Sequence, residues 1–137
     1  MTDFKALIEK QRETLAVVRE STLDVEFGGE LVTIGVSKVL PEEWDALVGA
    51  CPPRPGRQDD AQVGYNPKAL AARYPNVTVD GEKIDPDVWA EGFAIMDPTW
   101  RNNVEITIWG VNINESLKAL RELGKARAGQ SSPLPAN

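Results

Sequence analysis

Side chains capable of acid–base or metal chemistry are few in this sequence and gather in two places. Glu42, Glu43 and Asp45 form one acidic group, and Asp59 and Asp60 form another. Paired carboxylates can act as general acids and bases or bind Mg²⁺ and Ca²⁺. The first group is better explained as negative charge at the start of a helix, and the second as part of a solvated loop. Neither group therefore predicts a catalytic or metal site.

Most other catalytic and cofactor sites depend on residues that the sequence lacks. It has no histidine and one cysteine, Cys51, so it lacks the commonest general base and cannot build the usual zinc site within one chain. It has no Walker-type glycine loop, no nucleophile elbow and no dinucleotide fingerprint. Cys51 precedes two prolines and is expected to be a small buried apolar residue. We therefore expect no catalytic residues, no metal, no cofactor and no enzymatic activity.

Composition narrows the class of protein further. A length of 137 residues suits a single globular domain, and the net charge of −6 argues against a nucleic-acid partner, because phosphate binding needs a basic patch. The N-terminus lacks the apolar stretch of a secretion signal, and no run approaches the length of a membrane span. The lone cysteine fits a reducing compartment. These features predict a cytoplasmic protein with no membrane partner.

The first half of the chain predicts a helix, a hairpin and a second helix. Apolar residues at helical spacing indicate an amphipathic helix over Asp3–Arg19. Two alternating segments then flank Gly28-Gly29, which is typical of a β-hairpin and not of a phosphate loop. Pro41 suits the first position of a helix that ends at Cys51. We expect the polar segment from Pro52 to Gly64 to be an exposed, mobile loop.

The second half repeats one helix-start signal three times. Asn66-Pro67, Asp85-Pro86 and Asp97-Pro98 each place a capping side chain before a proline. The helices expected after them cover Pro67–Tyr74, Pro86–Met96 and Pro98–Trp109, with a small hairpin at Val77–Ile84 and a last helix from Asn114 or Glu115 to Arg127. The expected class is helix-rich α+β: a helical segment 1–20, one globular domain 21–128 containing the hairpin and a bundle of short helices, and a disordered C-terminal tail 129–137.

Four tryptophans lie within the expected helices, and most should fill the core. One or two left on the surface could instead anchor a partner. The preferred candidate surface is the helix from Trp100 to Trp109, and the second is the N-terminal helix, whose apolar face could pack on its own domain or on a second copy, giving a homo-oligomer. The residues proposed to bind a partner are Trp44, Trp89, Trp100, Val104, Ile108 and Trp109.

The order of these features resembles the tail assembly chaperones of long-tailed (siphovirus-type) bacteriophages that infect actinobacteria. The resemblance spans roughly Leu31 to Gln130 and does not include the N-terminal helix. Its residues are Leu31-Val32-Thr33-Ile34, Leu40 to Val48, Cys51-Pro52-Pro53, Gly64-Tyr65-Asn66, Trp89, Arg101-Asn102-Asn103, Ile108 to Asn112 and Leu123 to Ala126. None of these is a catalytic signature.

The resemblance implies a factor that works in the cytoplasm of the infected host and is absent from the mature virion. Such chaperones coat the hydrophobic tape measure protein and help to recruit tail tube subunits around it. Many are made in two lengths by a ribosomal frameshift, and Gly124-Lys125 can be encoded by a slippery heptamer. The same glycine also makes sense as a helix stop.

Two other classes of protein stay open at this point. One is a structural component of the particle, such as a head–tail connector or a tail completion protein. The other is a small bacterial enzyme or regulator of unrelated type. A gene directly upstream of a tape measure gene would favour the chaperone over the last of these.

Overall fold

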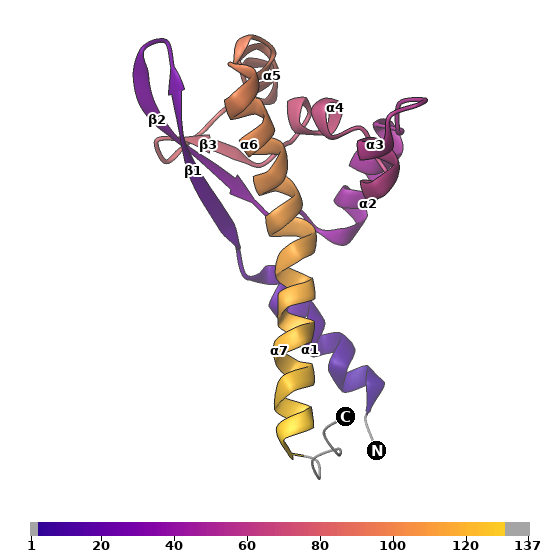
Figure 1. Ribbon diagram of the computed structural model, residues 1–137. Helices are drawn as coiled ribbons and strands as arrows, with labels where there is room; N and C mark the ends of the chain where they lie inside the picture. The colour runs from indigo at the N-terminus through magenta and orange to yellow at the C-terminus, as the bar shows by residue number, and fades with distance from the viewer. Residues whose placement is uncertain (1–2, 131–137) are drawn as a thin grey trace.

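The computed structural model describes residues 3–130 and has the expected helix-rich α+β class, with 60% helix and a four-stranded antiparallel sheet. Figure 1 shows a long helix passing beside the sheet and continuing beyond it, where the N-terminal helix lies next to it. In chain order the elements are α1 (Phe4–Ala16), β1 (Glu20–Phe27), β2 (Glu30–Ser37), α2 (Pro41–Ala50), α3 (Gln58–Val63), α4 (Pro67–Ala72), β3 (Val77–Val79), β4 (Glu82–Lys83), α5 (Pro86–Ile95), α6 (Pro98–Trp109), the π-helical η1 (Gly110–Asn114) and α7 (Glu115–Gln130).

Both hairpins expected from the sequence are present, and their turns explain why. Gly28 and Gly29 have φ of 62° and 81°, and they join β1 to β2 with Phe27 opposite Glu30. Asp80 and Gly81 have φ of 49° and 85° and join β3 to β4. Two successive residues with positive φ form the type I′ turn that matches the twist of paired strands.

The sheet is buried on one face only. The strands follow one another in the order β1-β2-β3-β4, and β2 pairs with β3 only over Ile34–Val36. Val25, Ile34 and Val77 point to the buried face, while neighbouring positions on β1 alternate to solvent. Helix α6 packs against β1 and β2. The core therefore lies between this face of the sheet and the helices of the second half of the chain.

Capping side chains fix where three of the helices begin. Asn66, Asp85 and Asp97 each accept a hydrogen bond from a backbone N–H two or three residues further on, and each precedes a proline at the start of α4, α5 or α6. This arrangement satisfies one of the free N–H groups of the first turn. The predicted starts of all three helices are confirmed, and α6 has the predicted bounds.

The segment from Pro52 to Gly64 is not the exposed loop that its composition predicted. It contains the short helix α3, and within that helix the Asp60 side chain is fully buried. Asp60 accepts two hydrogen bonds from the Arg54 side chain, at 2.8 and 3.0 Å, and one from the Arg54 backbone N–H at 2.9 Å. Each charged residue of this segment is expected to be solvated when it is considered alone. An ion pair allows two of them to be buried together, and a polar composition does not reveal such a pair.

The predicted break after Trp109 is also wrong. Gly110 has helical φ and ψ of −56° and −52°, and the π-helical segment η1 joins α6 to α7 without interruption (Figure 1). Helix α7 continues to Gln130, so residues 129 and 130, which were predicted to begin a disordered tail, are helical. The rest of that tail, 131–137, lies outside the described residues.

The described chain has two parts. The head comprises residues 20–114, which hold the sheet and the core. The stalk comprises α1 and α7, which lie side by side beyond the sheet in Figure 1.

Candidate protein-binding groove

Three of the residues predicted to bind a partner are instead part of the core. Trp89 is 4% exposed, Val104 is completely buried and Ile108 is 1% exposed. The Trp89 indole N–H also donates to the Ala71 carbonyl at 2.8 Å. A surface anchor must be accessible before it binds, and these three side chains are not accessible on the surface. The apolar stripe of α6 covers the sheet of its own domain.

The other three predicted residues are half-buried and do not form one surface. Trp44 lies in α2 and makes an edge-to-face contact with Tyr65, with ring centroids 5.4 Å apart. Trp100 packs against the core. Trp109 lines a hollow of about 390 Å³ beside Arg54 and Glu105. The structure therefore scatters the six predicted residues among the core, α2 and the outer side of α6.

The second candidate, the N-terminal helix, is the element that the domain leaves uncovered. None of the residues of α1 is buried. Of the fourteen large apolar side chains that are exposed within residues 3–126, nine lie on the stalk or where it joins the head. They are Phe4, Leu7, Ile8, Val17, Val18, Leu40, Leu117, Leu120 and Leu123. A concentration of this kind on a small protein marks an interaction surface.

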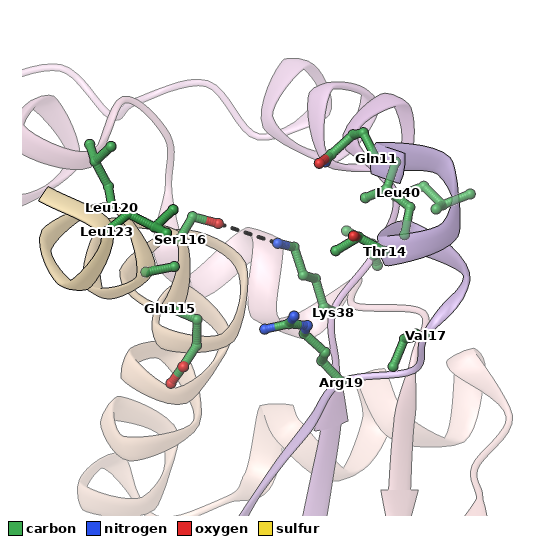
Figure 2. Close-up of a pocket in the computed structure, with 13 residues that line it drawn as sticks. Gln11, Thr14, Val17, Arg19, Lys38, Leu40, Glu115, Ser116, Leu120 and Leu123 are labelled. Carbon is green, nitrogen blue, oxygen red and sulfur yellow. Dashed lines mark hydrogen bonds between the residues drawn. The ribbon is translucent and has the colours of Figure 1, made fainter. Parts of the chain in front are cut away.

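A groove of about 390 Å³ separates the two stalk helices. Thr14 and Leu15 of α1 form one wall, Leu120 and Leu123 of α7 form the other, and Lys38 lies at the base. Figure 2 shows Lys38 reaching across to α7, where its ammonium group donates to the Ser116 hydroxyl at 3.3 Å. We call this space the stalk groove.

The stalk groove continues along α1 as an apolar depression lined by Phe4, Leu7 and Ile8. Gln11 and Thr14 line both stretches, so they form one surface. The sequence placed Leu117, Leu120 and Leu123 on one face of a helix but gave no sign that this face would lie opposite α1. The position of Leu120 and Leu123 across a groove from α1 is therefore a finding of the structure.

Charge is distributed unevenly between the stalk and the head. The head carries sixteen acidic and seven basic residues, a net charge of −9. Residues 3–19 carry a net charge of +1 and α7 carries +2. The groove and its extension are lined by four cationic side chains and one carboxylate: Lys10, Arg12, Arg19, Lys38 and Glu115. Arg12 is paired with Glu9, and Lys10, Arg19 and Lys38 against Glu115 leave the rim of the groove basic on an otherwise acidic protein.

A buried hydrogen-bond network fixes the long helix to the head where α7 begins. Asn112 of η1 donates to the Tyr74 hydroxyl at 2.8 Å and to the Ile108 carbonyl at 2.9 Å, and its carbonyl oxygen accepts from the Val39 N–H at 3.2 Å. Tyr74 in turn donates to the Ser37 carbonyl at 2.6 Å. Burial raises the pKa of Tyr74 to about 12, so its hydroxyl stays protonated at neutral pH. This network sets the direction in which α7 leaves the head.

Replacing Asn112 with alanine is expected to destabilise the protein by about 1–3 kcal/mol, because the buried Val39 N–H loses its partner. Urea denaturation followed by tryptophan fluorescence measures the loss. Asn114→Ala is the matched control, since Asn114 lies in the same π-helical segment and its side chain makes none of these bonds. Equal losses for the two variants would contradict the role given to the network.

The Arg54–Asp60 ion pair predicts how the stability of the fold depends on pH. Hydrogen bonds from Arg54 lower the pKa of Asp60 to about 2, below the value of about 3.9 for an unfolded chain. The pair therefore stabilises the fold above about pH 4, and this contribution is lost as the pH falls towards 2. Burial raises the pKa of Glu105. Protonation of Glu105 therefore favours the folded state as the pH falls, which is opposite to the effect of Asp60.

The expected result is that the urea midpoint falls between pH 5 and about pH 2 in the parent protein and falls less in Asp60→Asn, which cannot titrate. Glu105→Gln serves as the comparison, because removal of a carboxyl with a raised pKa should leave the acid-induced loss at least as steep. If the urea midpoint fell equally in the parent and in Asp60→Asn, protonation of Asp60 would not contribute to the loss of stability in acid.

Other chemistry-bearing groups in the described residues do not gather into a site. Cys51 is buried, and burial raises the pKa of its thiol, so its expected role as a buried apolar residue is confirmed. Within residues 3–130 no three acidic or cysteine side chains lie close enough to hold a metal ion. None of the helices in this range is both long enough and apolar enough to cross a membrane.

Comparisons with protein-family models, with curated proteins and with solved structures gave no match. The groove is a channel with a basic rim between two helices, next to an acidic head. Those features are typical of surfaces that bind other proteins.

Proposed function

We propose that this chain is a tail assembly chaperone of a long-tailed bacteriophage. It binds exposed apolar segments of the tape measure protein, keeps that protein soluble and helps to recruit tail tube subunits. It acts in the cytoplasm of the infected host and is released before the virion is complete. No catalytic step, metal or cofactor is part of this proposal.

The observation that supports the proposal is the pair of apolar helix faces that meet at the stalk groove. Helix α1 has no buried residue, and Leu120 and Leu123 of α7 line the opposite wall of the groove. A surface of this kind can cover a partner's apolar stripe and release it later, because it is formed without reorganising the core. The sequence resemblance to tail assembly chaperones includes α7 and supplies the identity of the partner.

Co-expression with the tape measure protein tests the proposal. We expect the tape measure protein to be largely insoluble alone and to remain soluble, and to copurify, when this chain is present. Failure of the chain to change its solubility would contradict the proposal.

A head–tail connector or tail completion protein is the alternative, and mass spectrometry of purified virions separates the two. A chaperone should be absent from the particle. A fixed copy number per virion would instead assign the chain to the particle structure.

A further inference from the structure

The stalk groove has the dimensions of a seat for one helix. The residues that line the groove and its extension run from Phe4 to Leu15 on α1 and from Glu115 to Leu123 on α7, which correspond to about 17 and 12 Å at 1.5 Å per residue. A third helix of about three turns would span these residues and complete a three-helix arrangement. Its apolar side chains would then meet Ile8 and Leu15 on one side and Leu120 on the other.

The charges around the groove specify the flanks of that helix. Lys10, Arg19 and Lys38 against Glu115 leave the rim of the groove and its extension positively charged, while Arg12 is paired with Glu9. An occupant with acidic residues beside its apolar stripe would pair with this rim, while a basic occupant would meet repulsion. A second copy is disfavoured for the same reason, because two stalks that both carry excess positive charge would be brought together.

A basic apolar surface can also bind an anionic membrane, but two observations favour a protein. The apolar side chains lie on both walls of a concave groove, whereas a membrane-bound helix presents one outward face. In addition, the head has a net charge of −9, which an anionic membrane would repel.

From these features we propose that the stalk groove and its extension bind a single amphipathic helix of about three turns whose apolar stripe is flanked by acidic residues. This inference rests on the proposed function in that it describes the segment of the partner that the chaperone grips. The partner is held between α1 and α7 by apolar contacts, and the basic rim selects it by charge.

Two synthetic peptides of about 16 residues test the inference with the full-length protein. One places leucines at helical spacing with glutamates beside them, and its twin has lysine in place of each glutamate. In fluorescence anisotropy at low salt, the acidic peptide is expected to bind at least about tenfold more tightly than its twin. High salt should reduce that difference.

Variants locate the binding site of the acidic peptide. Leu120→Glu should weaken its binding at least about tenfold, while Ile95→Glu, on an exposed apolar residue of the head, should leave it unchanged. Combined Lys10→Glu and Arg19→Glu substitutions should remove the preference for the acidic peptide. Circular dichroism shows whether each variant remains folded.

Several results would overturn the inference. They are equal binding of the two peptides, binding of neither, binding that Ile95→Glu impairs as much as Leu120→Glu, and capture by phosphatidylglycerol vesicles in preference to the acidic peptide. A dimer that Leu120→Glu dissociates and the acidic peptide does not would also overturn it. Co-expression with the tape measure protein is a separate readout: if that protein is held soluble while the peptides fail, the proposed function stands and only the acidic-helix inference falls.

Discussion

Replacing Ile108 with alanine is expected to destabilise the protein by about 2–5 kcal/mol, which is a large part of the stability of a domain of this size. The Ile108 side chain is 1% exposed, and it lies on the face of α6 that covers the sheet. Removing it deletes buried methyl groups and leaves a cavity that the close-packed core can fill only in part. Urea denaturation monitored by tryptophan fluorescence measures the change in the free energy of unfolding.

Ile106→Ala is the matched control for this substitution. The two isoleucines are two residues apart on α6, but Ile106 is 57% exposed, so its removal should change the free energy of unfolding by no more than about 0.5 kcal/mol. If both variants lost the same stability, the burial of one face of α6 would be wrong. If Ile108→Ala stayed fully stable and lost partner binding, the original interpretation of this helix as a binding surface would be restored.

Most of the helix starts and turns that were predicted correctly depend only on residues that are close together in the sequence. A capping side chain followed by proline places the start of α5 at Pro86 and that of α6 at Pro98, because both features act within one helical turn. The turn at Gly28 depends on backbone conformations that few other residues adopt easily. Signals of this kind are complete within a few residues, so no knowledge of the tertiary structure is needed to use them.

The assignment of the binding surface failed because periodicity does not say what covers an apolar face. Helix α6 and helix α1 both have apolar stripes, and α6 was preferred as the binding surface because it is richer in tryptophan. In the structure the stripe of α6 lies against the sheet, whereas the stripe of α1 has no partner within the described residues. The choice between core and interface is made by the packing of distant elements, which a single sequence does not contain.

The remaining errors have the same origin. Asp60 reads as solvated until Arg54, six residues earlier, is placed beside it. The residues from Gly110 to Asn114 lie between two separate predicted helices, whereas the structure has them as a π-helical segment in which Asn112 donates a hydrogen bond to Tyr74. In each case a contact between residues that are weak signals alone overrides the local preference.

Glutamate in place of Ile8 or Leu120 is expected to remove the ability of the chain to hold the tape measure protein soluble, with a loss of affinity of at least about tenfold for each substitution. Neither side chain is buried, so the free energy of unfolding should change by no more than about 0.5 kcal/mol. Leu120→Glu places a charge on a wall of the stalk groove and Ile8→Glu places one in its extension along α1, where an apolar partner would have to desolvate it.

The comparison that decides the role of the groove is Ile95→Glu, because Ile95 is 76% exposed and lies on α5, away from the stalk. All three variants add one negative charge at an exposed apolar position, so a general effect of charge or of lost surface hydrophobicity would act on all of them alike. Co-expression with the tape measure protein should give a soluble complex with Ile95→Glu and an insoluble partner with the other two. Equal solubility in all three cases would place the binding surface outside the stalk and leave the apolar faces of α1 and α7 without the function proposed for them.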